Sequence, residues 1–164
     1  MSIDTDLQKI AEQEQQLRFD QFDASDAWQL GSRLQQLALA RQAPVAIEIR
    51  INGHTLFYYA MPGATPSNQD WIRRKRNTVE RFHTSSYAKG LALEHQGRAL
   101  EASIGVAAKD FATHGGSFPI LLRGGLCIGS ITVSGLPQRQ DHALVVEVLC
   151  EHLKRPLASL ALAD

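Results

Sequence analysis

Residues 45–61 constrain the fold more strongly than any other part of this 164-residue chain. The first half, Val45-Ala46-Ile47-Glu48-Ile49-Arg50-Ile51, alternates β-branched apolar residues with small or charged ones, as a half-buried strand does. Asn52-Gly53 follows, and this pair favours a type I′ turn between two antiparallel strands. The pattern therefore predicts a two-residue hairpin, with Ile51 opposite His54, Ile49 opposite Leu56, Ile47 opposite Tyr58 and Val45 opposite Ala60.

In this register one face of the hairpin is almost entirely apolar. The other face is mixed, and it would be covered by a helix or meet a ligand; it carries Glu48, Arg50, Thr55, Phe57, Tyr59 and Met61.

A second hairpin is predicted at residues 118–134, where two apolar runs meet at Gly124-Gly125. The second run, 126–133, is apolar on both faces, which indicates a central position in the sheet. A helix from residue 138 carries Val145, Leu149 and Leu153 as one apolar stripe suited to lie on that sheet.

The remaining periodic segments predict helices. We expect N-terminal helices within residues 4–42, at about 4–18 and 26–42, and middle helices within 67–97, the first opened by a cap at Ser67-Asn68-Gln69-Asp70. A break near Gly90 is left open. This order of elements is typical of a single α+β domain over residues 1–164, with a largely antiparallel sheet.

Composition narrows the class of protein. The chain has 17 basic and 17 acidic residues and is 44% hydrophobic, which excludes wholesale disorder and argues against nucleic-acid binding. It has no run of 18 apolar residues and no basic–apolar secretion signal at its start, so we expect no membrane association. Cys127 and Cys150 lie in apolar runs and read as inert core thiols, which favours a cytoplasmic location.

The zero net charge hides two opposite blocks. Residues 1–26 carry seven acidic and two basic side chains, whereas residues 70–81 carry five basic and two acidic ones. Such blocks can complement each other between the subunits of an oligomer.

Lys75 is the most unusual residue of the basic block. On a helix it falls in the middle of the apolar sector formed by Trp71, Ile72, Val79 and Phe82, whereas Arg73 and Arg76 fall outside that sector. Two interpretations stay open. The side chain extends past its apolar neighbours to water or a partner carboxylate, or its ammonium meets an anionic ligand or a buried acid.

No catalytic motif stands out. The six histidines show no zinc-binding spacing, and the chain lacks both a phosphate loop and a nucleophile elbow, so catalytic residues stay unknown. The candidate metal or haem ligands are His83 at a helix end, His114 beside two glycines, and His142, which Asp141 could orient. Gly129 leaves room within a strand for a close neighbour, either a packed element or a flat ligand.

Several blocks of the sequence resemble the GlcG/HbpS-like family of haem-degrading domain proteins. They are Gly115-Gly116-Ser117-Phe118-Pro119-Ile120, then Gly124-Gly125-Leu126-Cys127-Ile128-Gly129-Ser130-Ile131-Thr132-Val133-Ser134-Gly135, and Gln140-Asp141-His142. The helix containing Arg74-Lys75, Thr78 and Phe82 looks like that family's "R-K-x-x-T-x-x-x-F" pattern. The form of residues 71–77 and of 133–138 is most similar to an uncharacterised branch related to a yeast protein.

The resemblance implies a three-layer α/β/α sandwich around a central, largely antiparallel five-stranded sheet, similar to profilin-like folds. It also implies a homo-oligomer. Some members of the family bind haem or assist its breakdown, so haem becomes a candidate cofactor, and others accompany cobalamin or glycolate enzymes.

Three hypotheses follow. The favoured one is an oligomeric small-ligand-binding or accessory protein without demonstrated catalysis, which binds an anionic metabolite or cofactor between the Lys75 helix and the strand around Gly129. Arg73, Arg76 and Asp141 complete the candidate binding residues. The alternatives are a haem-binding or haem-degrading protein, in which Arg73 or Arg76 pairs with the propionates, and a scaffold for protein–protein assembly.

Overall fold

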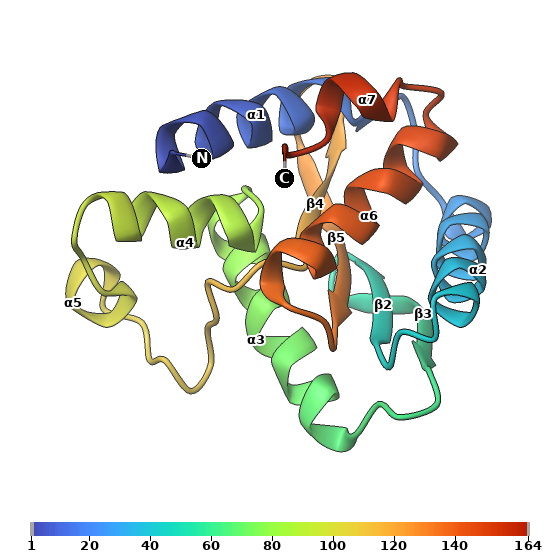
Figure 1. Ribbon diagram of the computed structural model, residues 1–164, viewed down its shortest axis with the longest axis horizontal. Coiled ribbons are helices and arrows are strands. Elements are labelled where there is room, and N and C mark those ends of the chain that lie inside the picture. Colours follow the sequence, from blue (N-terminus) through green and yellow to red (C-terminus); the bar gives the residue numbers. More distant parts are fainter. Residues whose placement is uncertain (1, 164) are drawn as a thin grey trace.

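The computed structural model describes residues 2–163, apart from the side chains of residues 103 and 104, and forms an α/β/α sandwich (Figure 1). The strands are β1 (Arg18–Phe19), β2 (Ala46–Ile51), β3 (His54–Ala60), β4 (Ser117–Leu122) and β5 (Cys127–Ser134). The helices are α1 (Ile3–Gln16), α2 (Ala24–Ala40), α3 (Pro66–Phe82), α4 (Ser86–His95), α5 (Leu100–Ile104), α6 (Gln138–His152) and α7 (Leu157–Leu160).

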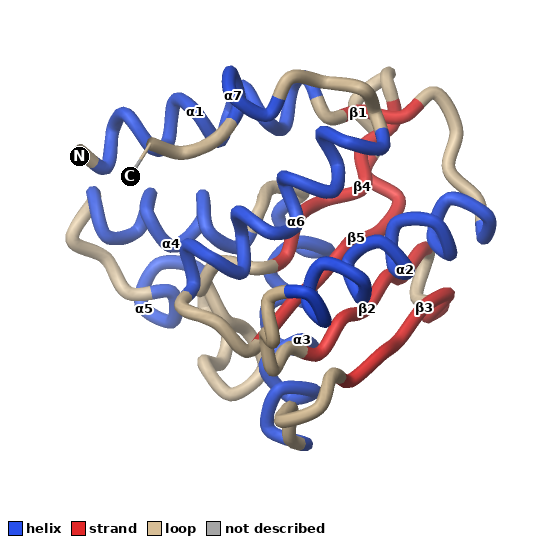
Figure 2. The backbone as a smooth tube through the Cα atoms, turned by 45° about the vertical axis from the view of Figure 1, so that its right-hand side comes forward, coloured by secondary structure: helices blue, strands red, loops and turns tan. Residues whose placement is uncertain are grey.

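The five strands form one sheet in the order β1-β4-β5-β2-β3. Only the short β1–β4 pair is parallel, so the predicted largely antiparallel sheet is confirmed, as is the central position of β5. Helices α2 and α6 cover one face of the sheet and α3 lies against the other (Figure 2). Helices α1, α4 and α7 pack together beside this sandwich, around Ile10, Tyr87 and Leu91.

The first hairpin forms as predicted at its turn and differs along its strands. Asn52 and Gly53 both have positive φ, 48° and 78°, as a type I′ turn requires, and Ile51 lies opposite His54. The pairing then shifts by one residue at a bulge, so Ile49 faces Phe57. The predicted partners of Ile49, Ile47 and Val45 are therefore wrong.

Burial of an aromatic ring explains the shift. The bulge turns Phe57 from the mixed face into the core, where 9% of it stays exposed. Its ring fills the space above Gly31 of α2, where a Cβ would lie only 2.4 Å from the ring. Tyr58 moves in exchange to the opposite face, across from Glu48.

Other element boundaries differ modestly from expectation. The first helix ends at Gln16, and after Leu17 the chain forms β1. A strand of two residues is too short to leave a periodic signal in the sequence. Helix α3 starts earlier than its predicted cap, because Asn68 accepts the backbone N–H of Thr65 at 2.8 Å. Helix α4 runs unbroken through Gly90.

The two faces of the sheet differ in chemistry. Toward α2 and α6 the sheet presents apolar residues of the main core, including Ile47, Ile131 and Val133. Toward α3 it presents buried hydroxyls, and Ser117 and Thr132 on neighbouring strands are hydrogen-bonded at 2.8 Å. The hydroxyl of Thr78 on α3 donates to the carbonyl of Ala112 at 2.7 Å. Helix α3 is therefore attached by polar contacts as well as by apolar packing.

Candidate functional site

A cavity opens where α3, the loop before β4, the end of β5 and the start of α6 meet. It measures about 240 Å³ and is lined by Asn68, Trp71, Lys75, His114, Ser134, Gly135, Leu136, Gln138 and Asp141. Two of the predicted binding residues, Lys75 and Asp141, and one candidate histidine, His114, therefore share one cavity.

The floor of the cavity is a buried ion pair. The Lys75 ammonium donates to Asp141 Oδ2 at 2.9 Å and to the carbonyl of Val133 at 3.2 Å. The two side chains are 4% and 1% exposed. Burial lowers the pKa of Lys75 and raises the pKa of Asp141, and each group partly offsets the shift of the other.

The local backbone explains why this pair forms. Asp141 lies in the first turn of α6, and its carboxylate also accepts the N–H groups of Gly135 and Leu136, at 3.3 and 3.0 Å. Gly116 provides the room above it: its φ is 128°, and a Cβ there would lie 2.8 Å from Lys75 Nζ. The glycine-rich loop and the β5–α6 turn thus enclose the pair.

His114 and Trp71 form the wall of the cavity. Their rings meet edge to face, with centroids 5.1 Å apart, and the Arg74 guanidinium stacks on the Trp71 ring at 4.4 Å. Partial burial and then the positive charges of Lys75 and Arg74 lower the pKa of His114. The imidazole therefore experiences a positive potential in this cavity.

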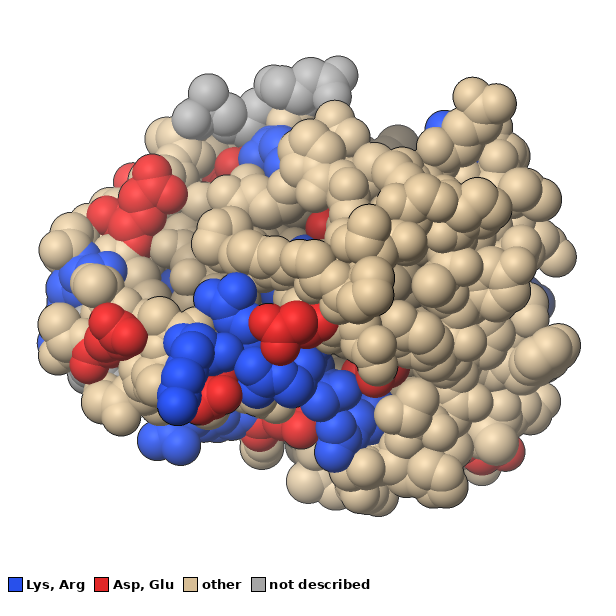
Figure 3. Space-filling view, turned by 90° about the horizontal axis from the view of Figure 1, so that it is seen from below, with Lys and Arg blue, Asp and Glu red and all other residues tan. Residues whose placement is uncertain are grey.

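Arg73 and Arg76 lie outside the cavity and are paired within the chain. Arg73 contacts Asp70 and Asp110, and Arg76 donates to Glu48 at 2.6 Å. Both arginines border a separate hollow of about 330 Å³ that also includes Glu48 and Asp70. On the face seen from below, basic side chains accordingly gather with acidic ones between them (Figure 3).

Gly129 also lies away from the cavity. It is near the start of β5, whereas the β5 residue that lines the cavity is Ser134 at the end of the strand. Its close neighbour is the backbone of β2: a Cβ on Gly129 would lie 1.9 Å from the carbonyl oxygen of Arg50. The glycine therefore permits the pairing of β5 with β2.

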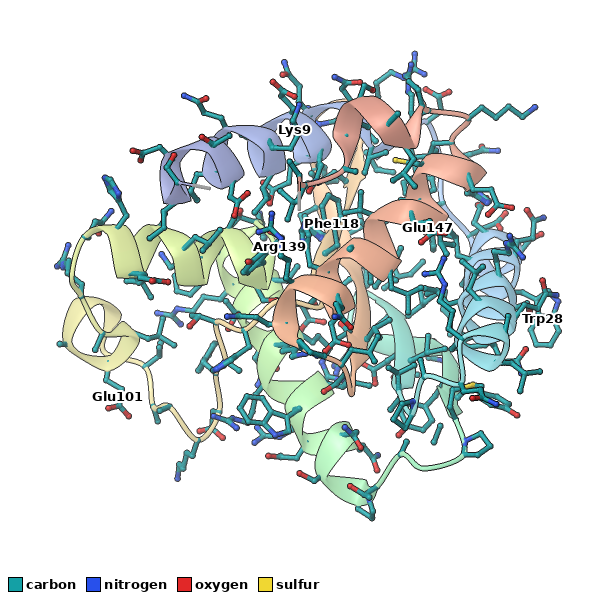
Figure 4. All side chains as sticks on the ribbon, in the orientation of Figure 1. Lys9, Trp28, Glu101, Phe118, Arg139 and Glu147 are labelled. Carbon is teal, nitrogen blue, oxygen red and sulfur yellow. The ribbon has the colours of Figure 1, made fainter. Side chains whose placement is uncertain are left out.

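The other two candidate histidines are separated from the cavity. His83 is exposed and ends α3 in the left-handed conformation. His142 lies on α6 and is only 1% exposed. Its ring lies beside the rings of Tyr87 and Phe118, and Phe118 is labelled near the centre of the molecule in Figure 4. Among the described side chains no group of three or more His, Cys, Asp or Glu residues is placed to hold a metal ion.

His142 has its own partner, which is Gln13 of α1 rather than Asp141. The Gln13 amide nitrogen donates to the carbonyl of Leu160 at 2.7 Å, so its oxygen faces the imidazole. His142 Nε2 therefore carries the hydrogen and donates to that oxygen at 2.8 Å. Complete burial, followed by the charge of Arg139, lowers the pKa of His142 to about 3.

Sequence reasoning identified the two members of the ion pair but not their contact, because 66 positions separate them. It did not select Trp71, Gln138 or Ser134 as cavity residues. Trp71 belongs to the apolar sector predicted for its helix, and Gln138 and Ser134 lie within or beside the quoted family blocks. Those blocks were the one available signal, and they flank the cavity from both sides.

The acidic N-terminal block and the basic helix find partners within the chain. Asp6 pairs with Arg139 at 2.6 Å, Asp20 with Arg123 at 2.6 Å, and Asp26 with His152 at 3.3 Å. These three acidic residues of the first block thus connect the N-terminal segment to α6 and to the β4–β5 turn. In residues 2–163, no helix has the length and apolar character needed to cross a bilayer.

Comparison with known proteins places these observations in a family. Residues 22–150 match the family described as "Haem degrading protein HbpS-like". A UPF0303 protein of Rhizobium etli is 53% identical over 163 residues, which is 99% of each chain, and one of Azotobacter vinelandii is 53% identical over 162 residues, 99% of this chain and 98% of its own.

Solved structures show the same fold. The crystal structure of the Ybr137w protein has a TM-score of 0.84 and 31% identity, covering 90% of this chain and 87% of that one. This match agrees with the expected kinship to a yeast-related branch. A structure titled "PduOC:Heme Complex" has a TM-score of 0.66 at 24% identity, covering 80% and 94% of the two chains. The chain belongs to the HbpS-like family, in the branch that also contains the UPF0303 proteins.

Proposed function

We propose that this protein is a small-ligand-binding or accessory protein that holds an anionic metabolite or cofactor in the Lys75 cavity. One observation carries the proposal. An ammonium group has three hydrogens, and within the described residues Lys75 Nζ has two acceptors, Asp141 and the carbonyl of Val133. The third hydrogen is available to an acceptor in the cavity that Lys75 lines.

The surrounding charges favour an anion. Asp141 is already engaged by two backbone N–H groups and by Lys75, so its negative charge is largely compensated. Burial lowers the pKa of His114 on the cavity wall, and the positive charges of Lys75 and Arg74 lower it further. A carboxylate or similar group would therefore gain from Lys75 without displacing Asp141.

The volume limits the size of the ligand. Sites for drug-sized molecules enclose about 300–1,000 Å³, and this cavity measures about 240 Å³. A metabolite of few heavy atoms, or the acidic end of a larger molecule, fits that space. Trp71 and Leu136 supply apolar contacts, and the amides of Asn68 and Gln138 supply orienting hydrogen bonds.

A thermal-shift experiment with small carboxylates tests the proposal. The probes are acetate, succinate and citrate at matched ionic strength, with sodium chloride as the blank. We expect at least one of them to raise the melting temperature of the protein, and the double variant Lys75→Met/Asp141→Asn to lose the shift. Lys109→Met is the control, because Lys109 is exposed and does not belong to the cavity lining.

The double variant removes the ammonium without stranding a buried charge, and the asparagine oxygen still accepts from the β5–α6 turn. If every carboxylate shifts the wild type and the double variant equally, the Lys75 cavity is not the binding site.

Haem binding is the second candidate, and the family description supports it. Of the three candidate histidines, His114 is the one that lines the cavity. The cavity alone is too small to enclose a haem, so we rank this function second. A stoichiometric Soret shift on haemin titration, lost in His114→Ala, would favour haem, whereas an unchanged Soret band together with a carboxylate shift would favour the metabolite.

We also propose a homo-oligomer in the cytoplasm. Trp28 on α2 and Tyr59 on β3 are 67% and 43% exposed, and Trp28 projects from the outer edge of the molecule in Figure 4. Exposed aromatic side chains of this size support an interface, and the free thiols of Cys127 and Cys150 support a reducing compartment. Light scattering at micromolar concentration tests assembly, and a monomer mass would exclude it.

A further inference from the structure

Another hollow lies at the opposite end of β5 from the Lys75 cavity, beside the β4–β5 turn. It measures about 520 Å³, and its lining consists of three arginines and two glutamines: Gln15, Gln16, Arg18, Arg123 and Arg155. Among the described residues, no acidic side chain belongs to this lining. We call it the arginine hollow.

The backbone fixes the position of all three arginines. Arg18 is a residue of β1 and pairs with Leu121 of β4. The backbone N–H of Arg123 donates to the carbonyl of Phe19 at 2.8 Å, and the backbone N–H of Arg155 donates to the carbonyl of Cys150 at 2.8 Å. The arginines come from three separate segments of the chain, and the fold brings them around one concave surface.

Their charges are poorly compensated. Arg123 pairs with Asp20 at 2.6 Å. Arg18 uses its Nε to donate to the carbonyl of Glu14 at 3.0 Å, which leaves its two terminal nitrogens free of that bond. Among the described residues, no carboxylate lies within salt-bridge distance of Arg18 or Arg155, and the Arg155 side chain has no hydrogen-bond partner.

Convergence of three guanidinium groups costs Coulomb energy unless an anion joins them. The neighbouring hollow shares all three arginines, and its lining adds Lys154 together with Asp20 and Asp26. Guanidinium groups bind tetrahedral oxyanions through paired N–H donors, and the carboxamides of Gln15 and Gln16 can donate to the remaining oxygens. The site thus offers many donors, and two of its three arginines, Arg18 and Arg155, have no carboxylate among the described residues within salt-bridge distance, whereas Arg123 is paired with Asp20.

We propose that the arginine hollow is an anion site for a phosphate-type oxyanion, either free phosphate or the phosphomonoester of a small molecule. Its shape favours a single group over a nucleic-acid strand, because backbone tracking needs a stripe of cations and these arginines surround one depression. The proposal is independent of the Lys75 cavity, whose lining shares no residue with this hollow.

Isothermal titration calorimetry with inorganic phosphate tests the site, in a low-salt buffer at pH 7.5 with chloride as the ionic-strength blank. We expect saturable binding to the wild type and a dissociation constant raised about tenfold in Arg155→Gln. Because the Arg155 side chain is exposed and unbonded, this variant should fold normally, which circular dichroism checks. Arg98→Gln is the matched control, an exposed arginine outside the hollow, and it should bind phosphate like the wild type.

Two further arms identify the source of the anion. Glycerol 3-phosphate that binds at least as tightly as inorganic phosphate, and is equally sensitive to Arg155→Gln, would indicate a phosphomonoester; tighter binding of inorganic phosphate would indicate free phosphate. Absence of binding, or equal binding by Arg155→Gln and the wild type, would overturn the proposal. So would a single-stranded oligonucleotide that binds more tightly than either probe and depends on Arg155.

Discussion

The Lys75–Asp141 pair yields the sharpest energetic prediction. Exposed ion pairs contribute about 0–1 kcal/mol to stability, whereas removal of one partner from a buried pair costs about 3–5 kcal/mol. With side chains 4% and 1% exposed, this pair belongs to the buried class. Each survivor keeps other partners, two backbone N–H groups for Asp141 and the carbonyl of Val133 for Lys75, so the lower end of the range applies.

We therefore expect Lys75→Met and Asp141→Asn each to lower the free energy of unfolding by about 3 kcal/mol. The double variant should lose only about 2 kcal/mol, since no buried charge is left without a partner. The coupling energy is the sum of the losses in the two single variants minus the loss in the double variant, and it is then about 4 kcal/mol. Urea denaturation of the four proteins at pH 7.5 measures all of these terms.

The pH dependence of Lys75→Met provides an internal check. Burial already raises the pKa of Asp141, and loss of the lysine removes the first of the interactions that oppose this rise. The folded variant then binds a proton more readily than the unfolded chain, so its stability decreases as the pH rises above the usual pKa of a carboxyl. The deficit relative to the wild type should be larger at pH 8 than at pH 5. Additive single costs, or a deficit independent of pH, would refute the buried-pair reasoning.

Three further predictions concern stability. Folding lowers the pKa of His142 to about 3, so the unfolded chain takes up a proton at this residue that the folded protein does not. Between pH 7.5 and pH 5 the free energy of unfolding of the wild type should therefore fall by about 2 kcal/mol more than that of His142→Phe, as measured by urea denaturation. Parallel pH profiles of the two proteins would contradict this. Gly31→Ala should destabilise by about 1–2 kcal/mol despite better helix propensity, because its Cβ would lie 2.4 Å from the Phe57 ring, and Phe57→Leu should relieve the effect. Gly129→Ala should cost about 3 kcal/mol or more, since it meets the β2 backbone, whereas Gly124→Ala, with open space around it, should change the melting temperature little.

Local patterns predicted the parts of this fold that depend on local chemistry. The Asn52-Gly53 turn forms because both residues tolerate positive φ. Strand β5 lies centrally in the sheet, as its apolar residues on both faces predict. The bulge in β3 could not be predicted, since it depends on the space above Gly31, which belongs to a different element. Strand β1 was missed because two residues carry no periodicity.

For the candidate site, the sequence predicts which residues matter but not how they contact one another. The position of Lys75 in an apolar sector predicts an acidic partner or an anionic ligand, because an isolated buried ammonium is unstable, and the structure places Asp141 beside it. The identity of that partner depends on how the β5–α6 turn presents Asp141 to α3, which no pattern along the chain encodes. In the sequence Asp141 is the neighbour of His142 that could orient the imidazole, yet on α6 the two side chains bind different partners, Lys75 and Gln13.

The polar underside of α3 has a consequence for how the cavity keeps its shape. An apolar helix face can slide or roll over a sheet at modest cost, because dispersion contacts have no preferred direction. Rotation of α3 by one residue, about 100°, would instead break the bond from Thr78 to Ala112 and remove Lys75 from Asp141 together. The Lys75 ammonium is thus fixed in one position before any ligand binds. Binding therefore does not have to offset the conformational entropy that a mobile lysine side chain would lose.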